Sequence, residues 1–550
     1  MIKKEIVREV EGRFELTETL PDSQLYNKDL APVPLEKRTW RYYEFFAIWV
    51  GMSVCVPTWM LAASMIAAGF NWVVSIGTIA LGQLIILIPL VLNSFPGAKY
   101  GIPMPVLLRS SFGIFGANIP ALLRGVVAAG WFGIQTMIMA FALDGIFVAL
   151  SPEGYGGIAG IVGFFNLPAH LVISFFISWI ITVVICYYSP PGKSAPGIKW
   201  LNDISAPILL LIGIGLLWWA FTEAGGSWGP ILGQPTTASW AVWPAFLTAM
   251  VAYWAPIAIN ISDLTRFAKT QKVQYIGQTL GLPTTMTAYS FIGLAVTSAT
   301  VLIYGEAIWD PVALMIKTEN AFFIFVGLVF IILATLTTNV TANMVAPIND
   351  FMHPIPKYLN WERTTILVGL IGIIMQPWRF LADPNAYIWT WLLGYGAFLG
   401  PVAGVLIADF WIVQKQRIKL DDLYSRKGYY DFRGKTDYGA IIALLVMAAL
   451  IIFYATKGLI LGSGWPSWLS TGVMVLGILG AIYLDIADKK GINMCGALSL
   501  YLGIVLAVGS QLIVPGLGMY TWFIGIIIAF LAYYLLHTYW YGKKFPPLTE

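Results

Sequence analysis

Trp131 and Gln135 lie four residues apart within a long apolar stretch. Residues at this spacing share one face of a helix, so the face carries an aromatic plane beside an amide donor and acceptor. Trp254 lies in a second apolar stretch, two residues before a proline. A flat ring stacks on aromatic faces, while an amide hydrogen-bonds to its N–H and C=O edges. The pattern predicts a site for a planar, amide-rich ring.

A polar run from Ala334 to Asn343 indicates a second kind of chemistry. Thr337 and Thr338 follow Ala334 at helical spacing, so two hydroxyls lie on one helix face. Together with carbonyls freed from a broken helix, they supply neutral oxygen ligands for a hard alkali cation. Alternatively, the hydroxyls bond back to their own helix or join neighbouring helices. Asn343 lies about 140° around the helix from Thr338, so it can reach a ring while the threonines face the cation.

Two apolar stretches are interrupted near their centres. One interruption lies between Gly51 and Pro57, and the other between Tyr253 and Pro256. Unpaired backbone inside a membrane is tolerated only where it lines a cavity or binds something. Ordinary proline kinks are the alternative, but a matched pair in two halves of a chain is typical of an inverted-repeat transporter with its site at the repeat interface.

Composition explains why these stretches must be membrane spans. The 550 residues are 58% hydrophobic and 11% charged, against about 25% charged in soluble domains. Windows of about 20 apolar residues predict fourteen helical spans, which we number in chain order: 43–68, 71–93, 118–149, 168–188, 201–222, 240–262, 282–303, 321–345, 364–381, 386–413, 438–457, 468–486, 493–513 and 518–540. Most of the 23 tryptophans are then expected at membrane interfaces or in packing contacts, but Trp131 and Trp254 are too central.

The basic residues predict the orientation. With a cytoplasmic N-terminus, 29 of the 32 Lys and Arg residues fall on the inner side, as the positive-inside rule requires. Both termini are therefore expected in the cytoplasm, and no nucleic-acid partner is expected. The predicted parts are a mostly solvated tail (1–42), a five-span repeat (43–222), a second five-span repeat (240–413), a cytoplasmic loop (414–437), four further spans (438–541) and a C-terminal tail (542–550).

Other classes of protein fit less well. An enzyme needs convergent titratable groups, but the three histidines lie near span ends and no paired carboxylates or metal-binding spacing occur at mid-membrane. Asp144 and Asp203 are the acids within spans, and each is a candidate for relaying protons if the coupling ion is H⁺. A channel would need a filter sequence or a ring-forming charge motif. The three cysteines are too scattered for a disulfide framework. An uncoupled facilitator or channel for small polar solutes remains an alternative.

Several motifs, in order and spacing, resemble the nucleobase:cation symporter-1 family, which includes bacterial hydantoin, allantoin, uracil and cytosine permeases. The resemblance covers about 27–434 and is carried by Asn27–Pro34 with Lys37–Trp40, Lys99–Val106 with Arg109–Gly113, Gly130–Thr136, and Gly400–Gly404 with Ala408–Asp409.

The resemblance implies an all-α integral membrane protein with a LeuT-like 5+5 inverted repeat, broken spans 1 and 6, and additional C-terminal spans. It implies a transporter in the plasma (inner) membrane that takes up a nucleobase-like or hydantoin-like ring with Na⁺ or H⁺ as coupling cation, and no other cofactor. The substrate residues implied, together with those at the two interruptions, are Trp131, Gln135, Trp254, Asn343, Tyr253 and Cys55. The implied sodium ligands are the carbonyls of Gly51, Val54 and Ala334 and the hydroxyls of Thr337 and Thr338.

Two departures from the family pattern stand out. Cys55 replaces an amide side chain of the hydantoin transporter, so hydantoin itself is doubtful as the substrate. Spans 11 to 14 exceed the usual count of twelve, and the extra pair is expected to serve packing or oligomer contacts.

Overall fold

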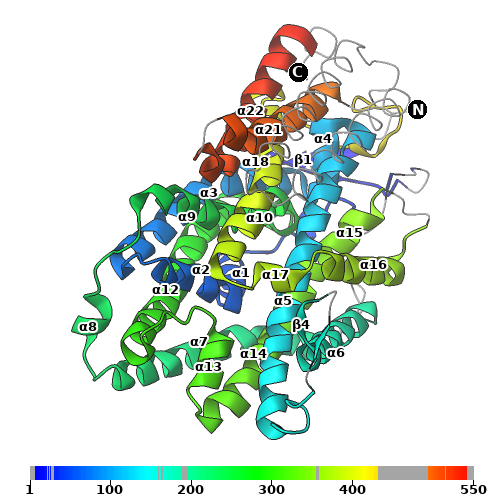
Figure 1. The fold of residues 1–550 in the computed structure, drawn as a ribbon. Coiled ribbons are helices and arrows are strands. Elements are labelled where there is room, and N and C mark those ends of the chain that lie inside the picture. Colours follow the sequence, from blue (N-terminus) through cyan, green and yellow to red (C-terminus); the bar gives the residue numbers. More distant parts are fainter. Residues whose placement is uncertain are drawn as a thin grey trace, which may run out of the picture.

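The computed structural model describes residues 6–20, 23, 25–26, 30–158, 160–162, 165–188, 196–354, 358–431, 493–513 and 516–541. In these ranges the chain is predominantly helical, with two short antiparallel hairpins. The helices form one bundle, with β1, α4 and α21 toward one end and α8 and α13 toward the other (Figure 1).

The first half of the chain contains, in order, β1 (Val7–Val10), β2 (Arg13–Leu16), η1 (Leu35–Lys37), α1 (Tyr42–Ser53), α2 (Val56–Ala67), α3 (Trp72–Tyr100), α4 (Met104–Gly116), α5 (Asn118–Leu150), β3 (Ile161–Val162), β4 (Leu167–Pro168), α6 (Ala169–Tyr187), α7 (Pro196–Glu223) and α8 (Trp228–Leu232). Strand β1 pairs with β2, and β3 with β4.

The second half contains η2 (Trp240–Val242), α9 (Trp243–Ala252), α10 (Ala255–Asn260), α11 (Ser262–Thr265), α12 (Gln271–Tyr304), α13 (Pro311–Lys317), η3 (Phe323–Gly327), α14 (Leu328–Thr338), η4 (Asn339–Met344), α15 (Val345–Met352), α16 (Trp361–Ile374), α17 (Pro377–Phe380), η5 (Ala386–Leu392), α18 (Leu393–Ile407), η6 (Ala408–Val413), η7 (Asp422–Tyr424), α21 (Met494–Ile513), η8 (Leu517–Tyr520), α22 (Thr521–Leu536) and η9 (His537–Tyr541).

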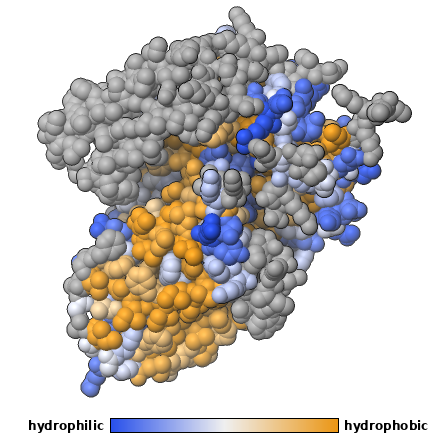
Figure 2. Space-filling view, turned by 90° about the vertical axis from the view of Figure 1, so that its right-hand side faces the viewer, coloured by the Kyte–Doolittle hydropathy of each residue, from blue (hydrophilic) through white to orange (hydrophobic). Residues whose placement is uncertain are grey.

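Apolar side chains cover the outside of the bundle as well as its core. Seven of the described helices are long and apolar enough to cross a membrane, and two bent pairs bring the number to as many as nine. Ile88 on α3, Leu211 on α7 and Ile374 on α16 are 63%, 66% and 71% exposed. Figure 2 shows apolar residues gathered over the lower part of one face. Lipid is the environment in which such a surface is stable.

Span 1 is broken between α1 and α2, where the chain bends by 60°. Val54 and Cys55 leave the helical conformation, and Cys55 is fully extended with φ −151° and ψ 160°. Pro57 lies in the first turn of α2, where its missing N–H costs no hydrogen bond. The interruption thus begins at Val54, within the segment that the sequence pattern indicated.

Span 6 changes from α9 to α10 at Tyr253 and Trp254, without the large bend of span 1, so that Trp240–Asn260 still counts as one membrane-crossing helix. We call this local irregularity the interruption of span 6. The N–H of Trp254 bonds to the carbonyl of Val251, a tighter turn than the α-helix makes. Pro256 then occupies the first turn of α10. Span 8 is also irregular, because its polar run forms the π-helical segment η4.

Some predicted boundaries differ from the structure. Helix α12 begins at Gln271, well before position 282, since its first turns are polar and escape a hydropathy window. Helix α16 ends at Ile374 and not near 381, because the residue before Pro377 is pushed out of the helical region, and Gln376 has φ 54°. Spans 13 and 14 correspond to α21 and α22. Spans 11 and 12 lie outside the described residues.

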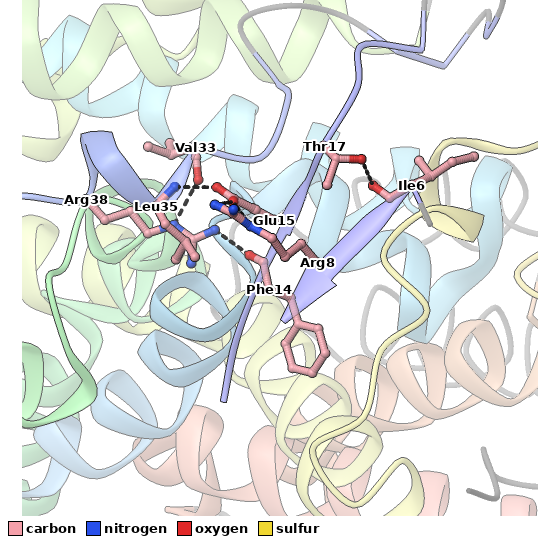
Figure 3. Close-up of polar contacts among 8 residues, drawn as sticks. All are labelled: Ile6, Arg8, Phe14, Glu15, Thr17, Val33, Leu35 and Arg38. Atoms are coloured by element: carbon pink, nitrogen blue, oxygen red, sulfur yellow. Dashed lines mark hydrogen bonds and ion pairs between the residues drawn. The ribbon is translucent and has the colours of Figure 1, made fainter. Parts of the chain in front are cut away.

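The predicted N-terminal tail is partly packed against the bundle, although most of its described residues are exposed or half-buried. Its hairpin packs on the end of α3, where Phe14 stacks on Tyr100 with ring centroids 4.9 Å apart. Glu15 accepts hydrogen bonds from the Leu35 N–H (2.7 Å) and from Arg8 (2.8 Å) (Figure 3). Arg38 is buried, and its guanidinium donates to the carbonyls of Phe14, Val33, Ala98 and Lys99.

Segments from several predicted inner loops meet on the same side of the bundle as this hairpin. Trp40 pairs with 267–269, and the side chains of Lys99 and Tyr100 donate to the Gln416 carbonyl. Arg109 on α4 donates to the Leu423 carbonyl (3.0 Å) and to His353 after α15 (2.8 Å). We call this side the inner face.

Candidate functional site

Four aromatic side chains meet around Trp131 near the centre of α5. Its ring contacts Tyr253, Trp391, Tyr387 and Tyr395 edge to face, with centroid distances of 5.4, 5.7, 6.3 and 6.3 Å. We call these five residues the aromatic box. All are buried. Helix α5, the interruption of span 6 and the helix of span 10 each contribute to it.

The span 10 members of the box were not predicted from the sequence. Tyr387, Trp391 and Tyr395 recur every four residues and so lie on one helix face. That spacing was visible, but in an aromatic-rich chain it does not differ from a packing stripe. Only their shared contact with Trp131 distinguishes them.

Trp254 joins the box through its neighbour. Its ring is perpendicular to those of Tyr253 and Trp49, with centroids 5.0 and 5.1 Å away. Tyr253 therefore lies between the two tryptophans expected to stack on a ring. A sandwich of the substrate ring between Trp131 and Trp254 stays a prediction. The Tyr253 side chain would have to move aside to admit that ring.

Cys55 and Tyr253 connect the two interruptions directly. The Tyr253 hydroxyl lies 3.0 Å from Thr58 Oγ1 and 3.5 Å from Cys55 Sγ, and Cys55 Sγ is 3.3 Å from Thr58 Oγ1. The three groups form a buried cluster of hydroxyl and thiol groups beside Trp131. Thr58 was not among the predicted site residues, although it follows the proline of the first interruption.

The site also holds buried polar atoms that find no partner among the described residues. These are the acceptor Gln135 Oε1 and the indole N–H donors of Trp254 and Trp391. An unpaired polar group costs about 1–3 kcal/mol when it is buried. Acceptor and donors beside an aromatic surface are the features that match the edges of a planar amide-rich ring.

Asn343 hydrogen-bonds within its own helical segment. Its Nδ2 donates to Asn339 Oδ1 (3.1 Å), and Asn339 in turn donates to the Phe132 carbonyl and to Thr136 Oγ1 (both 3.1 Å). These hydrogen bonds thus join η4 to the side of α5 that carries Phe132 and Thr136. A direct contact of Asn343 with the ring stays a prediction.

The candidate sodium ligands lie on α1, on the following Val54 and on α14. The Thr337 hydroxyl donates to the Ala334 carbonyl (2.9 Å), so two of the expected ligands are already adjacent. This bond is also the back-bonding that the alternative interpretation expects. Val54 is buried and Gly51 is exposed. Sodium binding by these residues stays a prediction.

A buried ion pair joins α5 to α15, toward the inner face. Arg124 on α5 and Asp350 on α15 are 3.1 Å apart, and both side chains are almost fully buried. When the Asn260 amide is oriented to satisfy both of its neighbours, its oxygen accepts from Arg124 (2.9 Å) and its nitrogen donates to the Pro256 carbonyl (2.7 Å). The sequence analysis did not identify this pair. Of the acids it did identify, Asp144 pairs with His170 at the start of α6 (2.8 Å).

The arrangement favours recognition over bond chemistry. Aromatic faces, one amide, two indole donors and a hydroxyl–thiol cluster gather between two interrupted helices. Such groups bind and orient a neutral ring.

The profile of permeases for cytosine and purines, uracil, thiamine and allantoin matches residues 32–480. The purine-uracil permease NCS1 of Arabidopsis thaliana is 39% identical over 435 residues, which cover 77% of this chain and 70% of that protein. The allantoin permease of Bacillus subtilis (strain 168) is 36% identical over 434 residues, which cover 78% of this chain and 87% of that protein.

Solved structures share the fold. The inward-facing structure of Mhp1 superposes with a TM-score of 0.72 at 23% identity and covers 96% of both chains. Closed Mhp1 with bromovinylhydantoin bound, described as a nucleobase-cation-symport-1 family transporter, has a TM-score of 0.70 at 24% identity and covers 96% of this chain and 98% of Mhp1. The chain therefore belongs to the nucleobase:cation symporter-1 family of permeases for cytosine and purines, uracil, thiamine and allantoin, whose members are membrane transporters and not enzymes.

Proposed function

We propose that this chain is a secondary active transporter that imports a planar nucleobase-like or allantoin-like ring by alternating access, coupled to Na⁺ or H⁺. One observation carries the proposal: Gln135 Oε1, one helical turn from Trp131, is a buried acceptor without a partner among the described residues, and so are the indole donors of Trp391 in the aromatic box and of Trp254, which contacts it. Relatives named for purine, uracil and allantoin transport support this class of substrate.

The proposed architecture is the LeuT-like one. Spans 1–5 and 6–10 form two inverted repeats, and the interruptions of spans 1 and 6 open backbone groups toward the substrate. Fourteen spans, both termini in the cytoplasm and the plasma (inner) membrane complete the proposal. The interrupted helices at Cys55 and Tyr253 and the gathering of predicted inner loops on one face support it.

Substrate binding begins on the face of Trp131, because stacking needs no particular ring edge. Gln135 accepts a hydrogen bond from a ring N–H, and an indole N–H donates to a ring carbonyl. Expulsion of water from the box strengthens both bonds. Movement of Tyr253 admits the ring and shifts the cluster that Tyr253 forms with Cys55 and Thr58. Binding of the ring therefore changes the conformation at both interruptions.

Sodium, when it is the coupling ion, would be held by the Gly51, Val54 and Ala334 carbonyls and the Thr337 and Thr338 hydroxyls. A cation at these groups ties span 8 to the interrupted span 1. It would then favour the conformation in which the ring site is complete.

Uptake by proteoliposomes of the purified protein tests the proposal. The labelled panel consists of uracil, cytosine, allantoin, hydantoin and a purine, each with a sodium gradient, a proton gradient or no gradient. Accumulation of at least one ring above its equilibrium level under one of the gradients supports the proposal. Equilibration without accumulation would identify an uncoupled facilitator, and no saturable uptake of any ring would refute the proposal.

A further inference from the structure

Pro256 leaves the carbonyl of Ala252 without its helical donor. In an α-helix this carbonyl would accept from the N–H four residues later, but that residue is proline and has none. The Tyr395 hydroxyl of span 10 takes the place of this donor, at 2.9 Å from the Ala252 oxygen. Both residues are buried, so water cannot hydrogen-bond to the Ala252 carbonyl in place of the missing N–H. The tyrosine hydroxyl provides this hydrogen bond.

The Tyr387 hydroxyl makes a similar bond, but to a carbonyl that also has a helical donor. Its hydroxyl donates to the carbonyl of Pro57, at the other interruption, over 3.2 Å. Here the residue four positions on is Leu61, which has an N–H and lies within α2. The Pro57 carbonyl therefore keeps a helical partner even without the tyrosine.

The two tyrosines share their place beside Trp131, although the Tyr395 hydroxyl also hydrogen-bonds with the Trp131 side chain. They lie two helical turns apart on span 10, on either side of Trp391. Both rings contact Trp131 at 6.3 Å, and both are buried. The chain thus offers a pair in which one hydroxyl replaces a missing helical donor and the other adds to an existing bond.

We propose that Tyr395 is a positioning residue for substrate binding: by holding the Ala252 carbonyl, its hydroxyl fixes the interruption of span 6 and with it Tyr253 and Trp254. These two residues follow directly after Ala252, so any shift of that carbonyl moves their side chains relative to Trp131. The proposal rests on the proposed function, and it makes span 10 the element that sets the spacing between the aromatic surfaces.

Binding of a labelled ring to the purified protein tests the proposal. The ring is one that the wild-type protein transports, and its Kd is measured in detergent together with the number of sites and the melting temperature. Tyr395→Phe keeps the ring of the box but loses the hydroxyl, and it should raise Kd about fivefold or more. The matched control Tyr387→Phe should change Kd less than twofold.

Pro256→Ala in the Tyr395→Phe background separates positioning from simple stability. Alanine restores an N–H that can donate to the Ala252 carbonyl, so the melting temperature should recover. It also continues the helix through the interruption, so Kd should stay raised. Recovery of Kd together with the melting temperature would show that Tyr395 only satisfies a carbonyl, and would overturn the proposal.

The reactivity of Cys55 gives a readout without substrate. Its thiol touches Tyr253, so a loosened interruption should speed alkylation of Cys55 by a small maleimide in Tyr395→Phe, relative to buried Cys495 in the same molecule. Unchanged alkylation and unchanged Kd in a variant with a full number of sites would refute the positioning role while leaving the transport function intact. Absence of ring binding by the wild-type protein would refute both.

Discussion

The ring of Trp131 on α5 meets the ring of Tyr253 at the interruption of span 6 edge to face, with centroids 5.4 Å apart and planes inclined by 81°. This contact joins a continuous helix to an interrupted one at the centre of the bundle. In the proposed function, a ring that stacks on Trp131 would displace Tyr253, whose hydroxyl contacts Cys55 and Thr58 on span 1. This contact is where the proposal links binding to conformational change.

Replacing Trp131 tests the stacking surface. Trp131→Ala should weaken ring binding about 5- to 150-fold, the effect of losing about 1–3 kcal/mol of base–aromatic stacking. Trp131→Phe should recover part of the affinity. Trp218→Ala on α7, where the side chain is 67% exposed, is the control and should bind normally. Equal affinities in Trp131→Ala and wild-type protein would place the ring elsewhere.

Gln135 should act on ring edges. Gln135→Leu removes the acceptor, at a cost of about 1–3 kcal/mol for a ring whose N–H it reads. An analogue without that N–H should lose much less. The control is Gln83→Leu on α3, which removes another buried amide with no partner among the described residues. A loss of the same size for both analogues would argue against edge recognition.

The sodium hypothesis predicts reciprocal effects. If sodium binds at Thr338, then sodium should raise the affinity for the ring, and the ring should raise the affinity for sodium by the same factor, as linkage requires. Thr338→Ala should abolish this effect and leave weak sodium-independent binding, whereas Thr338→Ser should preserve it. The measurement is Kd against sodium concentration at fixed ionic strength and pH. A flat curve for the unmodified protein refutes sodium coupling.

The buried ion pair should matter for stability. Arg124→Met leaves the Asp350 charge buried without its partner, which typically costs about 3–5 kcal/mol. The melting temperature in detergent should fall markedly. Lys317→Ala breaks the exposed pair with Glu306, worth less than about 1 kcal/mol, and should change it little. Equal melting temperatures in Arg124→Met and Lys317→Ala proteins would contradict this assignment.

His353 predicts a loss of stability in acid. Arg109 only donates, so His353 Nε2 accepts from it and Nδ1–H donates to Asn118 (2.8 Å), which makes the ring neutral. Burial, and then the Arg109 charge, lower the pKa of His353 to about 3. In the unfolded chain this histidine has a pKa of about 6.5, so between pH 3 and pH 6.5 the unfolded state binds more protons than the folded state. The contribution of the neutral His353 ring to the free energy of unfolding is therefore complete above about pH 6.5 and is lost as pH falls toward 3.

The comparison protein for this effect is His353→Gln, which keeps a neutral acceptor and donor. Its melting temperature should fall less between pH 7.5 and pH 5 than that of the wild type. Parallel pH profiles of the two proteins would show that His353 does not titrate on unfolding.

Local features could be predicted from the sequence better than contacts between spans. Trp131 and Gln135 stay predictions that rest on helical spacing within one span, a local property, and the bend of span 1 falls between the glycine and proline that marked it. Tyr395 and Trp391 were missed because their contacts with spans 3 and 6 are long-range. For the same reason Arg38 was assigned to a solvated tail, since only folding brings it to the carbonyls at the end of α3.

The measurement that tests the central claim most directly is the location of a bromine-labelled ring, such as 5-bromouracil, by anomalous diffraction from crystals of the protein. A ring that the protein transports should give one anomalous peak at the aromatic box, within contact distance of Trp131 and with ring edges toward Gln135. A peak at another position in a transport-active preparation would contradict the account.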